Sequence, residues 1–539
     1  MSAPGISLKL TGFVFDHTVH ALSVVLPKEA AVDKGLSEYF RANPKLGHAD
    51  RGVVAETIYA VLRNKRSLAA AGDSEYPREL ALAALARVRG MNLKQFEHVL
   101  RPSETALIQR IKAYKLDEAP PAVRADMPDW LWERLVETRG LEGAEALARG
   151  LKQPAPLDLR VNELKLTREE ALAQLQASGI SGVATPYSPH GIRVTGKPVL
   201  QRHPLFMSGG VEVQDEGSQL LAELVAPKRG ELVVDFCAGA GGKTLALGAL
   251  MRSSGRLYAL DVAAGRLAKL KPRLARSGLS NVHPIRIDSE NDIKVKRMNG
   301  KADRVLVDAP CSGLGTVRRN PDLKWRHDPS DIAELAVKQA AILVAAGRLV
   351  RPGGRLVYAT CSLLDEENRA VVDAFLATHP EFFELDAVEL LAKRGVTIAS
   401  AAAPALELLP HVHGTDGFFA CVMERRAAPA PAKVAAPAAV AVEPVSEEKS
   451  LAEPETAAEP AAAVELEPAA EAQAEAAPEL ATVSEAQAEP ALDAAPEGKP
   501  APKPRAAPKA KPAPGSKAKA KAKPDLDPDP KAKPEPASE

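Results

Sequence analysis

The sequence predicts an α/β protein with a doubly wound parallel sheet, preceded by helices and a small α+β segment. Three strings indicate this fold class: DFCAGAGGKT at 235–244, DAPCSG at 308–313 and ATCS at 359–362. Each begins where a short apolar run ends, and such runs are typical of strands buried in parallel sheets. The first string has the form of a strand, a glycine-rich turn and a helix start.

The first part of the chain, residues 1–118, is expected to be a helical domain. Apolar residues recur at helical spacing in 50–63, where Asp50 is a candidate N-cap, and in 79–88 and 107–116. Residues 119–204 then predict a small α+β segment. It contains a helix that starts at 128–131 and a second helix at 167–177, which strands at 157–162 and 191–194 flank.

Residues 205–426 alternate between strands and helices, which indicates a parallel sheet with helices on both faces. The expected parallel strands are 232–236, 256–261, 283–287, 304–308 and 355–360, and a last pair at 382–385 and 418–423 closes one edge. A long amphipathic helix at 331–349 is expected to end before Pro352-Gly353-Gly354.

The last part, residues 427–539, is rich in Ala, Pro, Glu and Lys and is expected to be disordered. It holds 13 basic and 20 acidic residues, a formal charge of −7, which leaves +7 for the first 426 residues. A mildly basic body fits a polyanionic partner, although many enzymes carry such a charge without one. The lysine-rich run at 499–523 either contacts RNA or is a solvated tail.

Composition argues against several other classes of protein. The four cysteines form no CxxC pair, which argues against a disulfide scaffold and a zinc knuckle, so no metal is expected. The sequence shows no secretion signal and no apolar run of the ~18 residues that a membrane span needs. We therefore expect a cytoplasmic protein without membrane contact, in a reducing compartment that keeps thiols available.

Two of the cysteines occupy positions typical of catalytic groups. Cys311 and Cys361 follow strands that would lie roughly 5 Å apart, at the edge where ligands of such sheets bind. Two thiols facing one pocket beside a glycine-rich loop indicate covalent chemistry on an electrophilic ring. The alternative is that a cysteine is a small apolar filler, which we accept for Cys421 and favour for Cys237.

The glycine-rich loop indicates a nucleotide-like ligand. Gly239, Gly241 and Gly242 permit a sharp turn, and Asp261 stands where ribose hydroxyls bind. Asp288 and Asp308 add two acids at the same sheet edge, a set that suits cationic S-adenosylmethionine better than a pyrophosphate. Any single aspartate of this kind is equally well explained as a helix cap or a loop acid.

At the level of whole motifs the chain resembles a known family. VQDEGSQ from Val213, DFCAGAGGKT, DAPCSGLGTVRRNPDLKW and ATCSLLDEEN are similar to the RNA cytosine-5 methyltransferases of the Sun/Nop2/NSUN type, above all the bacterial ribosomal-RNA branch. The resemblance covers about 130–426, and the helical N-terminus resembles a NusB-like RNA-binding domain. One departure is Gly239-Ala240, where the family has Ala-Pro.

The resemblance implies a Rossmann-like methyltransferase core and roles for individual residues. Cys361 would be the nucleophile that attacks carbon 6 of cytosine, and Cys311 would help to expel the enzyme afterwards. Lys243 would lower a thiol pKa electrostatically. Asp308 would hold the amino end of S-adenosylmethionine or the base edge. The remaining cofactor contacts are Asp261 for the ribose, Asp288 for the adenine, and Cys237, Ala238, Gly239, Ala240, Gly241, Gly242 and Lys243 for the methionine part.

The basic string at 318–326 is a further candidate for RNA contact. Arg318, Arg319, Lys324 and Arg326 suit phosphates, and Trp325 suits base stacking, unless the string is a solvated loop.

The expected function is therefore S-adenosylmethionine-dependent methylation of carbon 5 of cytosine in RNA, most simply small-subunit ribosomal RNA. Two alternatives stay open. A NAD-dependent oxidoreductase would fit the loop and Asp261 but would give Cys311 and Cys361 no role. A non-catalytic RNA-binding assembly factor would need no intact cysteines. The sequence leaves the oligomeric state open, and we assume a monomer.

Overall fold

The computed structural model of the protein describes residues 10–27, 31–196 and 198–427. The expectation of a disordered tail at 427–539 falls outside the described residues, Ala427 apart. Described helices of the N-terminal region are α1 (Gly12–Val25), α2 (Val32–Ala42), α3 (His48–Arg63), α4 (Lys65–Gly72), α5 (Pro77–Ala83) and α6 (Glu104–Ala113). They enclose one apolar cluster that includes Phe15, Leu22, Ile58, Leu80 and Phe96.

Two details of these helices differ from the sequence-based expectation. Asp50 is not the cap of α3, because Gly47 holds that position and Asp50 lies in the first turn. The Asp50 carboxylate still stabilises the helix start, since its Oδ2 accepts a hydrogen bond from the Gly47 amide at 3.2 Å. Helix α5 ends at Ala83 and continues as a π-helical segment over Ala84–Val88.

A four-stranded antiparallel sheet follows in the chain. Its elements and neighbours are α7 (Pro121–Ala125), α8 (Asp129–Lys152), β1 (Leu157–Val161), α9 (Arg168–Ala177), β2 (Gly182–Ala184), β3 (Gly191–Val194), α10 (Pro204–Met207) and β4 (Val211–Val213). The strand order is β2-β3-β1-β4. Thr167 caps α9: its side chain accepts a hydrogen bond from the Glu170 amide, and the Glu170 carboxylate accepts one from the Thr167 amide.

The larger sheet confirms the predicted α/β class. Its elements are α11 (Glu216–Val225), β5 (Leu232–Asp235), α12 (Gly242–Leu250), β6 (Arg256–Asp261), α13 (Ala264–Ser277), β7 (Val282–Arg286), α14 (Ile293–Lys296), β8 (Ala302–Asp308), α15 (Leu323–Arg326), α16 (Pro329–Leu349), β9 (Val350–Thr360), α17 (Arg369–Thr378), β10 (Phe382–Leu385), α18 (Ala387–Ala392), β11 (Leu406–Leu408), α19 (Pro410–His413) and β12 (Phe418–Arg425). Strands run in the order β10-β12-β9-β8-β5-β6-β7, and β11 pairs with β12. β9, β8, β5, β6 and β7 are parallel, whereas β12 is antiparallel to its neighbours.

The boundary between α16 and β9 corrects one expectation. The strand begins at Val350, directly after the helix, so Pro352-Gly353-Gly354 lies within β9. Val350 pairs with Ala302 and Arg355 pairs with Arg304, which leaves residues 351–354 as an irregularity in the β8–β9 ladder.

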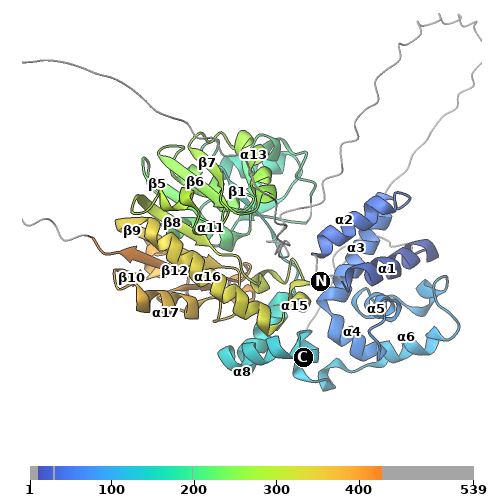
Figure 1. Ribbon diagram of the computed structural model, residues 1–539. Helices are drawn as coiled ribbons and strands as arrows, with labels where there is room; N and C mark the ends of the chain where they lie inside the picture. The colour runs from blue at the N-terminus through green and yellow to red at the C-terminus, as the bar shows by residue number, and fades with distance from the viewer. Residues whose placement is uncertain (1–9, 28–30, 197, 428–539) are drawn as a thin grey trace, which may run out of the picture. The chain divides into compact units, whose positions relative to one another are not determined.

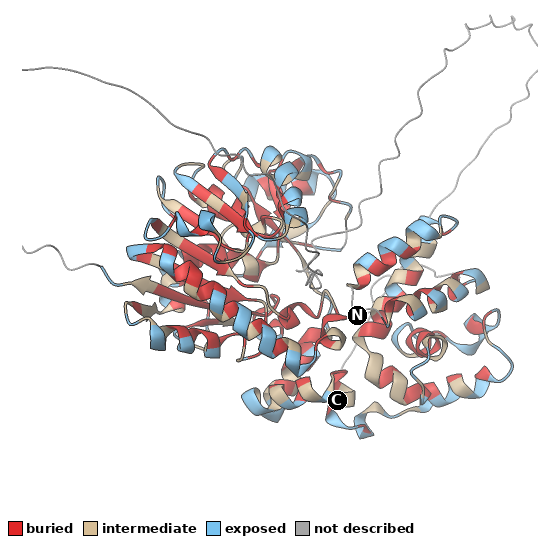
Figure 2. Ribbon diagram, in the orientation of Figure 1, coloured by how far each residue is buried: buried red, intermediate tan, exposed pale blue. Residues whose placement is uncertain are grey.

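Helices cover both faces of this sheet (Figure 1). Apolar residues of α11, α12, α13 and α18 pack on one face, and those of α14, α16 and α17 pack on the other. Strand residues alternate between the two faces: Val233, Leu306 and Val357 face the first, and Val234, Val305 and Tyr358 face the second. Figure 2 shows the strands buried between helices whose outer surfaces are exposed. Burial on both faces explains the continuous apolar runs in the sequence.

A search of the described part of the chain finds no helix that is both long enough and apolar enough to span a membrane.

Candidate functional site

The two candidate catalytic cysteines lie side by side. Cys361 directly follows β9 and Cys311 lies three residues after β8, and their Sγ atoms are 3.4 Å apart. Both side chains are partly exposed. The hydrogen bond from the Ala309 amide to the Ala359 carbonyl, 2.9 Å long, carries the parallel ladder past the end of β8. The register of two neighbouring strands therefore brings the thiols together.

Two glycines that the sequence analysis did not single out hold the Cys361 backbone. The Gly315 amide donates a hydrogen bond to the Cys361 carbonyl, and the Gly417 amide donates one to the Gly315 carbonyl, both at 2.8 Å. A Cβ atom at Gly315 would lie 2.2 Å from the Gly417 carbonyl oxygen and 2.9 Å from the Cys361 carbonyl oxygen. Only glycine fits at this close approach of three backbone segments.

A buried cation faces the same edge of the sheet. Lys243, the second residue of α12, donates from Nζ to Asp308 Oδ2 at 2.7 Å, and its side chain is 12 % exposed. Burial works to lower the pKa of Lys243, but the charge and hydrogen bond of Asp308 and the charge of Cys361 raise the pKa overall. The ammonium therefore stays protonated beside the thiols.

The cysteines differ in their surroundings. The hydrogen bond with Cys361, burial, and the charges of Cys361 and Glu367 hold the pKa of the Cys311 thiol well above its ordinary value. Burial, followed by the charges of Asp261 and Asp235, does the same to the pKa of Cys237. Cys237 packs partly buried against the core below the sheet edge, and Cys421 is fully buried there.

The glycine-rich loop turns sharply between β5 and α12. Gly239 and Gly241 adopt φ values of +56° and +86°, and a Cβ atom at Gly241 would lie 2.2 Å from Leu270 Cδ1. Asp261, at the end of β6, accepts hydrogen bonds from the Gly239 amide at Oδ2 and from the Ala263 amide at Oδ1, both at 2.8 Å. Asp261 therefore fixes the loop from the neighbouring strand.

Two further acids lie at this edge in different surroundings. Asp288 follows β7, and its side chain is 78 % exposed, with Arg286 Nη2 at 3.7 Å from its Oδ1. Asp235, at the end of β5, is buried; its Oδ2 accepts from Thr244 Oγ1 at 2.7 Å, and its Oδ1 has no hydrogen-bond partner. Burial raises the pKa of Asp235 to about 7, against the smaller effect of the Thr244 hydrogen bond.

The strand order places the sequence-predicted residues in a row. Across β9, β8, β5, β6 and β7 come, in turn, Cys361, then Asp308 with Cys311, then the loop from Cys237 to Lys243, then Asp261 and last Asp288. Neighbouring parallel strands lie about 4.8 Å apart. The row therefore runs from the thiol pair, past the glycine-rich loop, to an open edge.

The basic string at 318–326 is held by partners inside the protein, so it is not a solvated loop, and its contact with RNA stays a prediction. Arg318 and Arg319 form ion pairs with Asp215 and Asp416 inside the protein. The other members also have internal partners: Lys324 Nζ donates to the Arg63 carbonyl at 3.0 Å, Trp325 Nε1 to the Leu62 carbonyl at 2.7 Å, and Arg326 pairs with Asp322. Burial lowers the pKa of Lys324 to about 7. All these partners are distant in sequence except Asp322, so the local string did not reveal them.

Glu367 is another residue of this region to which the sequence analysis gave no role. Its side chain is fully buried and contacts the segments that carry both cysteines. The signal available in the sequence was its place in ATCSLLDEEN, six residues after Cys361.

No group of three or more His, Cys, Asp or Glu side chains within 10–27, 31–196 and 198–427 is arranged to hold a metal ion.

Comparison with known proteins identifies the family of this chain. The family model "16S rRNA methyltransferase RsmB/F" matches residues 222–424, and the model of an RsmF/B-like ferredoxin-like domain matches residues 127–200. The probable ribosomal RNA small subunit methyltransferase B of Bacillus subtilis (strain 168) is 30% identical over 446 residues, which cover 77% of this chain and 99% of the relative. The chain belongs to the RsmB/F family. It is therefore a ribosomal RNA small-subunit methyltransferase.

A further relative and two solved structures are similar to this chain. The ribosomal RNA small subunit methyltransferase B of Sodalis glossinidius is 39% identical over 292 residues, 54% of this chain and 64% of that protein. The crystal structure of PH0851 superimposes with a TM-score of 0.62 at 27% identity, covering 78% of this chain and all of that chain. The structure of NSun6 from Pyrococcus horikoshii with SFG has a TM-score of 0.50 at 23% identity, covering 55% and 98%, and shares the fold.

Proposed function

We propose that this RsmB/F family member methylates carbon 5 of cytosine in small-subunit ribosomal RNA, through a transient covalent bond between Cys361 and the base. The observation that carries the proposal is the 3.4 Å separation of the Cys311 and Cys361 Sγ atoms at the ligand-binding edge of the sheet. Two thiols this close serve one small ring. A pair of structural cysteines would need neither the shared edge nor partial exposure.

The residues at this edge fit S-adenosylmethionine. The loop from Cys237 to Lys243 makes a turn that only glycine permits at Gly241, and acids end β5, β6 and β8 and follow β7. The loop would hold the methionine part, Asp261 the ribose and Asp288 the adenine, while Asp308 would hold either the amino group or the base edge. When bound, S-adenosylmethionine supplies an electrophilic methyl group.

The chain's own residues then activate and release the base. Carbon 5 of cytosine is a poor nucleophile until the Cys361 thiolate adds to carbon 6, which makes the ring enamine-like. The Lys243 ammonium, paired with Asp308, favours the thiolate electrostatically. After carbon 5 has accepted the methyl group and lost its proton, the carbon 6–sulfur bond breaks, the ring double bond re-forms, and the electron pair returns to Cys361. Cys311 assists this release.

The target base must leave its stack to reach the thiols. A cytosine in a loop, in a loosely paired segment or flipped from a helix meets this requirement. We therefore place the substrate among accessible cytosines of the small-subunit RNA.

Substitution of each cysteine tests the two assigned roles. Cys361→Ala is expected to abolish methylation of ribosomal RNA that lacks the modification. Cys311→Ala is expected to accumulate a protein–RNA adduct, visible as slow migration on a denaturing gel. Cys421→Ala is the matched control, because Cys421 is buried in the core on the antiparallel side of the sheet, and it should methylate normally. Methylation by Cys361→Ala, or no adduct with Cys311→Ala, would show that the roles are misassigned.

Two measurements separate the alternatives. Calorimetric titration should detect S-adenosylmethionine binding and no NAD binding; the reverse would favour an oxidoreductase. Bisulfite sequencing of ribosomal RNA from a deletion strain should show at least one 5-methylcytosine lost. If every one persists, a non-catalytic assembly factor becomes the better description.

A further inference from the structure

We propose that Glu367 is the positioning residue of the thiol pair: its buried carboxylate joins the two cysteine-bearing loops and sets the spacing between Cys311 and Cys361. The role in catalysis rests on the function proposed above. The spacing of the two thiols does not depend on that function, and it can be measured without RNA or cofactor.

Glu367 receives four hydrogen bonds in the protein interior, where its exposed fraction is 0%. Its Oε1 accepts from the Ser312 amide at 2.8 Å and from Gln339 Nε2 at 3.0 Å. Its Oε2 accepts from Ser312 Oγ at 2.5 Å and from Ser362 Oγ. A buried carboxylate is costly unless donors compensate it, and here four donors do so.

The positions of these donors show which segments the carboxylate connects. Ser312 is the residue after Cys311, and Ser362 is the residue after Cys361. One side chain therefore ties together the equivalent positions of two loops that lie 50 residues apart in sequence. The serine hydroxyls also approach each other, at 3.3 Å.

The segment that carries Glu367 is itself fixed. Tyr358, in β9, donates from its hydroxyl to the Glu367 carbonyl at 2.6 Å. Asn368 accepts from Thr360 Oγ1 at 2.5 Å and donates to the Ser362 carbonyl at 3.3 Å. Gln339 of α16 donates to both Glu367 and the Pro310 carbonyl, at 3.0 and 2.9 Å. Glu367 is thus held at its main chain by a strand and at its side chain by a helix and its own loop.

The negative charge of Glu367 has a second effect. It is one of the groups that raise the pKa of Cys311, after the hydrogen bond with Cys361, burial and the charge of Cys361. The same side chain therefore favours the protonated form of Cys311.

Phenylarsine oxide measures the thiol spacing directly in the full-length protein. Its arsenic bonds to two nearby thiols and releases water, and the second bond is favoured because it is intramolecular. The wild type is expected to bind about one equivalent of phenylarsine oxide, which bridges Cys311 and Cys361. The Cys361→Ala variant is expected to lose this binding. Glu367→Ala, which removes all four acceptor contacts, should weaken this uptake roughly tenfold or more and reduce kcat while KM for S-adenosylmethionine changes little.

Glu367→Gln separates geometry from charge. Its amide can still bridge the loops, because its oxygen accepts from the Ser312 amide and its nitrogen donates to serine hydroxyls that rotate. Arsenical uptake should stay near the wild-type value. The variant lacks the negative charge, so the pKa of Cys311 should be lower. The rate of Cys311 alkylation, measured by mass spectrometry, should therefore begin to rise at a lower pH than in the wild type.

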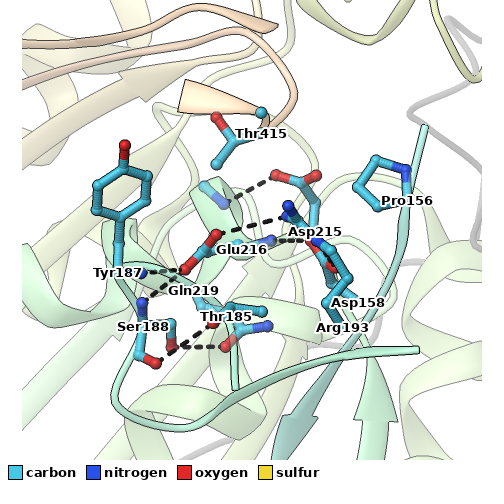
Figure 3. A network of polar contacts seen from close by, with 12 residues as sticks. Pro156, Asp158, Thr185, Tyr187, Ser188, Arg193, Asp215, Glu216, Gln219 and Thr415 are labelled. Atoms are coloured by element: carbon cyan, nitrogen blue, oxygen red, sulfur yellow. Dashed lines mark hydrogen bonds and ion pairs between the residues drawn. The ribbon is translucent and has the colours of Figure 1, made fainter. Parts of the chain in front are cut away.

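Glu216 provides the matched control for lost stability (Figure 3). It is equally buried and accepts from the Tyr187 and Ser188 amides at 2.5 and 2.8 Å, in a segment that carries neither cysteine. Glu216→Ala should lower the unfolding temperature as Glu367→Ala does, yet keep arsenical uptake.

The inference is overturned if Glu367→Ala binds the arsenical like the wild type, or if Glu216→Ala loses uptake equally. The two proposals can fail separately. If Cys361→Ala still methylates RNA, the proposed function fails, whatever the arsenical result. If Cys361→Ala is inactive but Glu367→Ala keeps the spacing, only the positioning role fails.

Discussion

Asp235 shows how a single buried acid at the sheet edge links stability to pH. Unfolded aspartate titrates near 4, whereas burial raises the pKa of Asp235 to about 7 in the folded protein. The folded state therefore holds this proton more tightly than the unfolded state does. The stability from this group is fully present below the unfolded pKa and is lost as pH rises through 7.

Asp235→Asn keeps a polar side chain but removes the titration. Between pH 4.5 and pH 8.5 we expect the unfolding temperature of the wild type to fall by a few degrees relative to this variant, measured by differential scanning fluorimetry. Asp288→Asn, at an exposed acid of the same edge, is the control and should run parallel to the wild type. If the unfolding temperatures of Asp235→Asn and the wild type change in parallel with pH, titration of Asp235 is not the cause of the pH dependence.

Residues at strand ends were predictable from local strings, and residues that join distant segments were not. Asp261 ends β6, Cys361 directly follows β9 and Cys311 lies three residues after β8, so sheet topology brings all three to one edge. Glu367, Asp416 and the buried arginines act through partners as many as 201 residues away in sequence. A string of charges looks the same whether it faces solvent or buried acids.

At the level of elements, the loop between β8 and α15 depends on close backbone packing. Gly315→Ala would place a Cβ atom 2.2 Å from the Gly417 carbonyl oxygen, and backbone cannot give way as a flexible side chain can. We expect destabilisation of about 2–4 kcal/mol in chemical denaturation and loss of methylation, because the hydrogen bond to the Cys361 carbonyl is displaced.

Gly265→Ala is the control for this prediction. Gly265 lies in α13, and a Cβ atom there would meet nothing within 4 Å. Alanine should stabilise the helix by about 0.5–1 kcal/mol. If Gly315→Ala proves as stable as the wild type, the close approach is not a constraint on the site.

The strands of the large sheet were predictable because their two-sided burial leaves a continuous apolar signature. Expected and observed bounds agree for β6 and β10, and they differ by a residue or two for β5, β7, β8 and β12. The start of β9 was missed, because Val350 pairs with β8 but residues 351–354 then interrupt the ladder until Arg355. Propensity alone assigns Pro-Gly-Gly to a turn.

On the scale of the whole molecule, a histidine joins the small sheet to the large one. His190 precedes β3 and lies between Glu163 Oε1, 3.0 Å from Nδ1, and Glu223 Oε1 of α11, 3.1 Å from Nε2. Burial works to lower the pKa of His190, but the hydrogen bonds and charges of the two glutamates raise it to about 9. The stability from this bridge is fully present below pH 6.5 and is lost as pH rises through 9.

His190→Gln is therefore expected to unfold a few degrees below the wild type at pH 6, with a difference that shrinks by pH 10. His283→Gln, at an exposed ring on β7, serves as the control and should change little at either pH. If the difference in unfolding temperature between His190→Gln and the wild type is the same at pH 6 and pH 10, packing rather than charge accounts for the stabilisation.

The broad division of the chain followed from composition, although the disorder expected for the C-terminal tail stays a prediction. The charge of the body gave no guide to where RNA binds, because Arg318 and Arg319 of the basic string at 318–326 form ion pairs inside the protein. Net charge counts residues, whereas an interface needs charges that reach the surface.

The order of strands has a consequence for engineering this enzyme. β8 lies between β9, which Cys361 follows, and β5, which leads into the glycine-rich loop, so the proposed base and donor sites meet on one shared strand. If the proposed function holds, changes of target preference belong on the β9 flank, and changes of donor analogue belong on the β6–β7 flank. Under that proposal, a library that leaves β8 unchanged would vary the two sites separately.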